Sequence, residues 1–197
     1  MPEAHETMEH AEHAEHAAHS NRKIALVIAV LALFLSFSET LGKSAQTEAI
    51  DANVKSSDTW AFFQAKDIRR TVLNAAADQT ALLAASTADP AGKAAIDKQI
   101  DTWRSTAARY ESDPKTGEGR KELAARAKAE EEDRDLAMAR YHHYELASAA
   151  FQIGIVLASA AVITSIMALA WFAGLLGAAG LGVLSLGLFA PHLLPLP

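Results

Sequence analysis

The residues of this chain that are best suited to chemistry are four histidines near its N-terminus. They recur every three residues and alternate with glutamates, at His10, His13, His16 and His19. If this segment is helical, each imidazole is rotated about 60° from the previous one, so neighbours can share a divalent ion. Imidazole and carboxylate together suit Zn²⁺, Ni²⁺ or Cu²⁺. The pattern predicts weak metal binding, and the alternative is a solvated acidic tail, disordered or weakly helical, over residues 1–22.

A second candidate is Glu39, which stands near the end of an apolar run. A carboxylate close to a membrane can bind ions or pack against polar groups of a neighbouring helix. Lys43 follows at the spacing of a helical ion pair, which favours a structural role. His142 and His143 precede a later apolar segment, where interfacial anchoring is the expected role.

The sequence offers no arrangement typical of an enzyme. The chain has no cysteine, which excludes disulfides, thiolate catalysis and cysteine-ligated zinc. It contains no phosphate loop, and no serine or carboxylate pair stands in a recognisable catalytic setting. A net charge of −6 is mild and argues against nucleic-acid binding. We expect neither catalysis nor a cofactor beyond the weakly bound metal.

The distribution of apolar residues is typical of a membrane protein. One apolar run covers residues 24–38, and residues 146–194 contain no Asp, Glu, Lys or Arg. Because about 20 helical residues cross a bilayer, the sequence predicts about three transmembrane helices, at 23–42, 147–171 and 174–190. The turn between the last two is expected at 171–174, and residues 191–197 form a short tail. Two spans with a re-entrant tail are the alternative.

A cleaved signal peptide is the competing interpretation of the first apolar run. The run is short, and residues 36–38 offer small side chains at a cleavage-like spacing. The preceding segment is long and acidic, however, and the helical pattern continues through Lys43, so we favour an uncleaved anchor. Arg22 and Lys23 indicate a cytoplasmic N-terminus.

Residues 43–146 predict a soluble stalk made of long helices. Helix-forming residues dominate, and glycine is absent from residue 43 to residue 91. Helices are expected at about 43–88, 90–111 and 120–146, which makes the fold all-α with a long helical-hairpin or coiled-coil-like insertion. Their lengths favour one helix leading outward and two helices returning end to end. A compact three-helix bundle is the alternative.

Along the first stalk helix, nine residues follow one another mostly at spacings of three and four, which is a helical period. They are Ile50, Val54, Ala61, Ala65, Ile68, Val72, Ala75, Gln79 and Leu82. Three of these nine residues are alanines, which bury little area, so a lone hairpin should be marginally stable. Small residues also recur at this spacing in the apolar segments, where they allow helices to approach closely within one chain or between chains. We therefore expect a homo-oligomer.

Trp60, Phe62 and Phe63 form the densest aromatic cluster of the stalk. On a helix Trp60 and Phe63 share one face, whereas Phe62 lies on another. Aromatic side chains on two faces cannot all pack inside a two-helix hairpin. The cluster predicts an interaction surface for a partner or a second subunit.

Four segments together resemble an uncharacterised family of bacterial inner-membrane proteins, known only as a domain of unknown function. They are residues 22–26, 39–48, 60–70 and 141–150. The resemblance implies a multi-pass protein of the bacterial inner membrane with a histidine-rich N-terminus. It implies no activity and no site residues.

Two functions fit these observations. The first is a membrane-anchored helical structural or interaction protein that binds the lipid bilayer, copies of itself and an envelope protein. The second is an oligomeric channel or divalent-metal-handling protein, in which the histidine tail gathers ions near Glu39.

Overall fold

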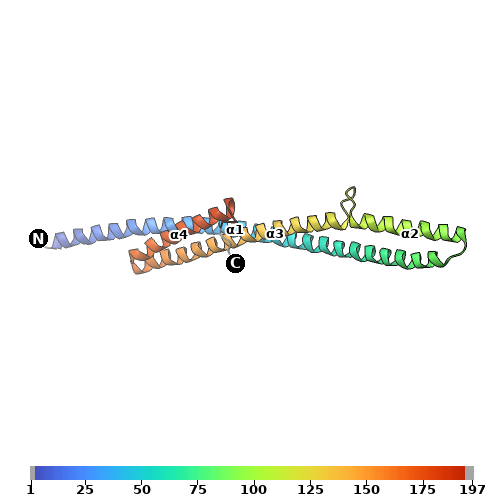
Figure 1. Ribbon diagram of the computed structural model, residues 1–197. Coiled ribbons are helices and arrows are strands. Elements are labelled where there is room, and N and C mark those ends of the chain that lie inside the picture. The colour runs from blue at the N-terminus through green and yellow to red at the C-terminus, as the bar shows by residue number, and fades with distance from the viewer. Residues whose placement is uncertain (1–2, 194–197) are drawn as a thin grey trace. The chain divides into compact units, whose positions relative to one another are not determined.

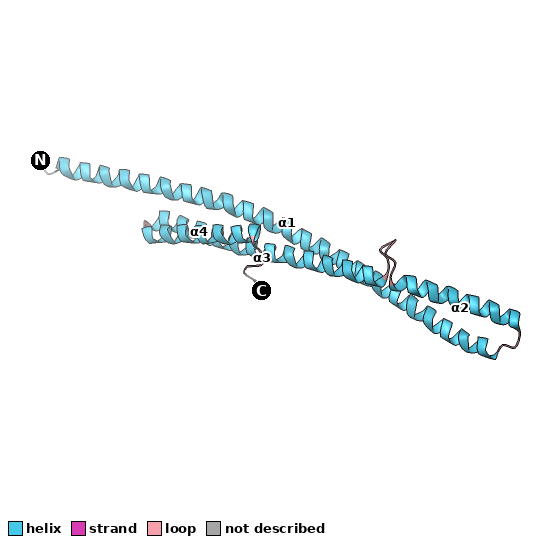
Figure 2. Ribbon diagram, turned by 45° about the horizontal axis from the view of Figure 1, so that its top comes forward, coloured by secondary structure: helices cyan, strands magenta, loops and turns pink. Residues whose placement is uncertain are grey.

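A computed structural model of the chain describes residues 3–193, and it describes side chains from residue 22 to residue 193. The predicted metal ligands His10, His13, His16 and His19 therefore lie outside the described side chains. The described residues form four helices, α1 (Glu3–Ser86), α2 (Pro90–Glu111), α3 (Arg120–Thr164) and α4 (Met167–Phe189) (Figure 1). Helices and loops account for all of them (Figure 2), so the expected all-α fold is confirmed.

The helices belong to two compact units. Unit 1 combines Met1–Glu48 with Leu136–Pro197, and unit 2 is Ala49–Asp135. Helices α1 and α3 each contribute to both units, whereas α2 belongs to unit 2 and α4 to unit 1.

Three of the described helices, α1, α3 and α4, contain stretches long and apolar enough to cross a membrane. The turn between α3 and α4 lies earlier in the chain than the predicted position at 171–174. Helix α3 ends at Thr164 and α4 begins at Met167, so Trp171 and Gly174 lie inside α4 instead of at the turn. Ser165 makes the turn with a φ of 57°, and the Thr164 hydroxyl accepts a hydrogen bond from the Ile166 amide at 3.4 Å. Local hydrogen bonds of this kind compete with helix continuation, which ends α3 here.

Unit 1 is held together by large side chains of α1 and α3 packed against small residues of α4. Phe151 is fully buried, and Leu31 and Leu184 belong to the same cluster. A Cβ placed on Gly180 would lie 2.8 Å from the Phe151 ring, so only glycine leaves room for that ring. The buried residues of α4 alternate at spacings of four and three: Ala173, Gly177, Gly180, Leu184 and Gly187. This seam packs within the chain, which is one of the two uses that the sequence allows for its small residues.

In unit 2, α1 lies antiparallel to α2 and the first part of α3, which follow each other along it (Figures 1 and 2). Ser56 donates a hydrogen bond to the Ala127 carbonyl at 3.5 Å. Farther along, Arg104 of α2 pairs with Asp78 of α1 at 3.4 Å. This is the end-to-end arrangement that the helix lengths favoured, and it differs from the compact three-helix bundle.

The side of α1 that faces α2 and α3 carries small residues. The buried positions in this part of the helix are Ala49, Ala52, Ser56, Thr59, Ala77 and Ala84. The stripe predicted from sequence lies elsewhere on α1, because its large side chains are exposed: Ile50, Val54, Ile68, Val72 and Leu82. A seam of small side chains lets the helices approach closely, and the bulkier residues then occupy the opposite face.

The glycine seam of α4 yields a matched pair of variants. Gly180→Ala should lower the thermal unfolding midpoint by several degrees, because the new methyl group displaces the buried Phe151 ring. Gly182→Ala should leave the midpoint unchanged or raise it slightly, since a Cβ there has nothing within 4 Å and alanine is the better helix former. Circular dichroism of the full chain in detergent measures both. Equal midpoints for the two variants would contradict this packing.

Candidate functional site

Glu39 lines an open groove of unit 1 between α1 and α3. The groove has a volume of about 530 Å³ and is lined largely by polar side chains, among them Ser38, Lys43, Gln46, Tyr141, Glu145, Ser148 and Gln152. Glu39 accepts a hydrogen bond from Gln152 of α3 at 3.3 Å, and both side chains are exposed. The Glu39 carboxylate therefore links α1 to α3. It also stands four residues before Lys43 on α1, at the spacing of a helical ion pair. The groove could take a small polar or charged group, and the contact with Gln152 also supports a packing role for Glu39.

Two buried hydrogen bonds are made by Ser38 and Tyr144, which both line this groove. Ser38 donates to the Tyr144 carbonyl at 2.8 Å, and the Tyr144 hydroxyl donates to the Gly187 carbonyl of α4 at 3.3 Å. His143 is fully buried, with its Nδ1 2.7 Å from the Ala139 carbonyl. Because a carbonyl only accepts, a hydrogen bond here requires the tautomer in which Nδ1 carries the proton. His143 thus packs inside unit 1, whereas its neighbour His142 is half-buried.

The three aromatic residues predicted to meet a partner have contacts inside unit 2. Trp60 donates from Nε1 to Glu131 of α3 at 2.9 Å, and its ring packs edge-on against Phe63 at 5.3 Å. Phe62 lies beneath the Lys66 ammonium, 5.0 Å from the ring centroid. All three side chains are half-buried. These contacts hold α1 against α3, and the role of the cluster as a partner surface stays a prediction.

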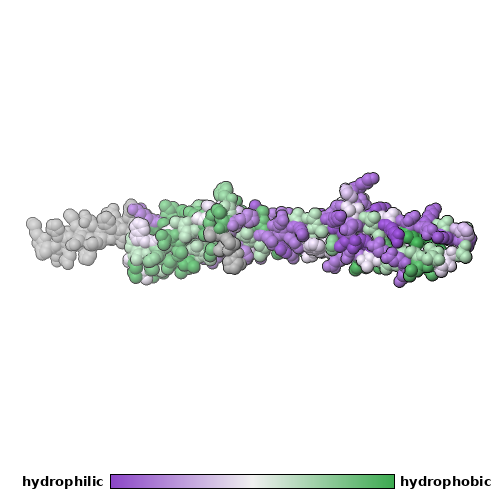
Figure 3. All heavy atoms as spheres, in the orientation of Figure 1, coloured by the Kyte–Doolittle hydropathy of each residue, from purple (hydrophilic) through white to green (hydrophobic). Residues whose placement is uncertain are grey.

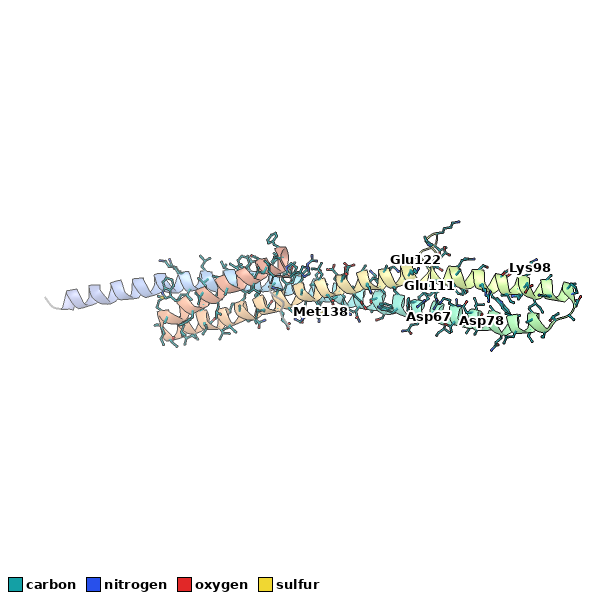
Figure 4. The ribbon with its side chains drawn as sticks, viewed as in Figure 1. Asp67, Asp78, Lys98, Glu111, Glu122 and Met138 are labelled. Atoms are coloured by element: carbon teal, nitrogen blue, oxygen red, sulfur yellow. The ribbon has the colours of Figure 1, made fainter. Side chains whose placement is uncertain are left out.

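A cluster of ion pairs lies beside these rings, at the point where α2 and α3 meet alongside α1. Glu111 of α2 accepts from Arg70 and from Arg120, each at 2.7 Å, so one carboxylate joins all three helices. Asp67 of α1 also pairs with Arg120, at 3.0 Å. Figure 4 labels the two carboxylates of this cluster, Asp67 and Glu111. The Arg120 guanidinium stacks over Phe63 at 4.8 Å. Two arginines and two carboxylates balance one another, so the cluster favours helix positioning over binding of a charged ligand.

Glu122, in the first turn of α3, joins the end of α2 to the start of α3. Its carboxylate accepts from the Ser112 hydroxyl at 2.6 Å and from the Asp113 amide at 3.2 Å. A Cβ on Gly119 would lie 2.6 Å from the Ser112 Cα, so the two helix ends touch while the residues between them form a loop. This contact makes α3 continue along α1 after α2 ends. The Ser112 hydrogen bond also lowers the pKa of Glu122 below its ordinary value of 4.5.

The polar residues of unit 2 thus connect helices, and the described residues contain no group of three or more His, Asp or Glu side chains arranged to hold a metal ion. Sequence reasoning did not identify the exposed face of α1 as a separate surface. The signal was present but ambiguous, because Ile50, Val54, Ile68 and Val72 follow the same spacing of three and four as the buried alanines and differ from them only in the helix face they occupy. The sequence alone did not show which of the two stripes faces the neighbouring helices.

The chain belongs to a family described as Domain of unknown function (DUF4337), which matches residues 20–190. The match therefore covers both units and begins after the last histidine of the N-terminal tail. No curated protein and no solved structure matches the chain. The family gives the architecture a name and assigns no activity to it.

The junction formed by Glu122 leads to a pH-dependent prediction. Because its pKa is lowered in the folded chain, the ionised carboxylate stabilises the fold above about pH 4.5, and this contribution is lost as the pH falls through the folded pKa. Glu122→Gln should therefore lower the unfolding midpoint at pH 7, and its difference from the unmodified chain should shrink in acid.

Thermal melts of the full chain at pH 7 and pH 3.5 measure this difference. Glu132→Gln removes an exposed carboxylate from the same helix and controls for the loss of one charge. A Glu122→Gln deficit that is equally large at both pH values would show that the junction does not depend on the ionised carboxylate.

Proposed function

We propose that this chain is a membrane-anchored helical structural protein that associates with copies of itself and presents unit 2 to an envelope partner. The observation that carries the proposal is the continuity of α1 and α3. Both helices pass without a break from a stretch apolar enough to cross a membrane into a charged segment. Helices α1 and α3 thus each connect an apolar stretch of unit 1 to residues of unit 2, as a membrane-anchored protein with a helical insertion requires.

The contacts of unit 2 support a structural role. Its cross-helix polar groups are used to fix one helix on another, through Glu111, Glu122 and Glu131. Its buried α1 side chains are small, so the hairpin gains little from its own core and benefits from further association. The proposed location is the bacterial inner membrane, and Arg22 and Lys23 favour a cytoplasmic N-terminus.

An oligomeric channel or divalent-metal-handling protein is the second candidate. The polar groove around Glu39 favours it, because an exposed carboxylate beside an apolar segment can attract cations. Against it, Leu31, Phe151 and Leu184 fill the space between the three helices of unit 1. A conducting path would then have to run between copies of the chain.

Ion flux separates the two candidates. Liposomes containing the full chain should take up Zn²⁺ and K⁺ no faster than empty liposomes, because the helices of unit 1 pack around a filled core. Uptake is followed with ion-sensitive dyes inside the vesicles. Flux above the empty-vesicle rate that disappears in Glu39→Gln and persists in Glu48→Gln would replace the structural proposal with the channel.

Recovery of the chain from the same vesicles tests the anchor itself. After alkaline carbonate extraction the chain should remain with the lipid, as expected for helices that cross the bilayer. Release into the supernatant would refute membrane anchoring.

A further inference from the structure

We infer that the outward face of α1 is the surface through which two copies of this chain pack side by side. The inference rests on the proposed self-association and names the surface that makes it. Within residues 49–135, all of which the structure describes, every exposed large apolar side chain belongs to α1: Ile50, Val54, Ile68, Val72, Leu82 and Leu83. Val72 is 60% exposed and Leu82 is 74% exposed, so the residues that the structure describes leave them uncovered. We refer to Ile50, Val54, Ile68, Val72 and Leu82 as the outer stripe.

The other two helices of unit 2 present a different surface. Their exposed positions are rich in charge, including Lys98, Arg104, Lys128, Glu132 and Asp133. Figure 3 shows hydrophilic residues over α2 and the start of α3 and apolar residues along the α1 edge of the same unit. Unit 2 therefore has one face suited to water and one face that would be stabilised by burial.

The spacing of the outer stripe indicates that its occupant is a helix. Between Ala61 and Leu82, the residues on this face follow one another at alternating spacings of four and three: Ala61, Ala65, Ile68, Val72, Ala75, Gln79 and Leu82. The buried residues that face α2 and α3 follow the same alternation. An alternation of four and three is the signature of helices that pack along their length.

The first apolar segment of α1, which belongs to unit 1, carries a stripe of exposed small residues of its own. Its members again follow a spacing of four and three, Ala25, Ala29, Ala32 and Ser36, and they lie beside exposed large side chains such as Leu26 and Leu33. Small residues permit close helix contact in a membrane, where large apolar ones gain nothing over lipid. One helix thus carries a small-residue stripe in its apolar part and a large-residue stripe in its charged part, as a helix needs if it meets its own copy in both environments.

The size of the outer stripe is sufficient for a dimer. From Ile50 to Leu82 the helix is about 50 Å long at 1.5 Å per residue. A contact about 10 Å wide buries roughly 500 Å² on each copy and 1,000 Å² in total, which reaches the lower limit of specific interfaces. Anchoring in one membrane raises the effective concentration of the copies, so a modest interface is enough.

The charges beside the outer stripe favour a second copy over a lipid surface. Asp51, Lys55, Asp58, Arg69 and Asp78 are exposed residues of α1 and include both signs, with acidic residues in excess. An anionic bilayer surface attracts clusters of lysine and arginine, which this face lacks. Copies inserted with the same topology enter unit 2 in the same direction, so the two α1 helices run parallel and identical residues face each other.

Cysteine cross-linking tests this surface sharply because the chain has no cysteine of its own. Val54→Cys, Ile68→Cys and Val72→Cys place one thiol each on the outer stripe. Asn74→Cys, on another face of α1, and Lys98→Cys, on α2, are exposed controls. Treated with a short bismaleimide in native membranes, the three outer-stripe variants of the full chain should form dimers at least ten times more efficiently than the controls.

Three other outcomes would overturn the inference. Dimers formed by the control variants and not by the outer-stripe variants would leave self-association intact and place it on another face. No cross-link at any position, together with free labelling of the outer-stripe thiols by a water-soluble maleimide, would refute both this surface and the proposed self-association. No cross-link with blocked labelling would show that lipid or a different protein covers the stripe.

Discussion

The close approach of α1 to its neighbouring helices is the constraint on which the rest of this structure depends. In unit 2 the approach is made by small side chains such as Ala49, Ala52 and Ala77, each nearly inaccessible to water. Close packing of small residues fixes the register of two helices but removes little apolar area from water. The larger apolar side chains of the same helix are left on the opposite face. A seam of this kind therefore specifies a hairpin more effectively than it stabilises one.

Polar contacts supply the specificity that an alanine seam lacks. Exposed ion pairs contribute little stability one at a time, but Glu111 joins Arg70 and Arg120 from two other helices in one shared contact. Glu122 then holds the end of α2 to the start of α3. Together these groups determine where α2 stops and how α3 continues, which the small residues alone leave open. The half-buried ring of Phe62 lies beneath Lys66, and that of Phe63 lies beneath Arg120, so both rings pack against cations next to these ion pairs.

The sequence predicted much of this architecture, because helix propensity, proline and charge act locally. Asp89 caps α2 through the amides of Ala91 and Gly92, and Pro90 stands at its first position, as its sequence indicates. What local signals could not decide was which stripe of α1 faces inward. Ala49 and Ile50 are neighbours, and each belongs to a stripe of residues with nearly the same helical period. Only the packing of the neighbouring helix shows that the alanine is buried and the isoleucine is exposed.

The turn between the last two apolar helices shows a second limit of sequence reasoning. Gly174 and Trp171 have the composition of a turn, yet α4 runs through both and the chain reverses at Ser165. Glycines in this segment serve packing: Gly180 makes room for the Phe151 ring, and Gly177 lies against Leu31. In a closely packed helix, glycine lets a neighbouring helix approach and does not have to end the helix. The site residues were harder to predict, because the contact between Glu39 and Gln152 joins residues 113 positions apart.

We propose that a chain with so small a core completes its packing with a second copy. The most direct test is the native mass of the full chain in lipid nanodiscs, measured by light scattering after subtraction of lipid and scaffold. We expect a protein mass of two chains, each 21.0 kDa, at the lowest concentration that can be measured. A mass of one chain that does not change as the concentration rises would contradict the claim and leave the exposed face of α1 to a different partner.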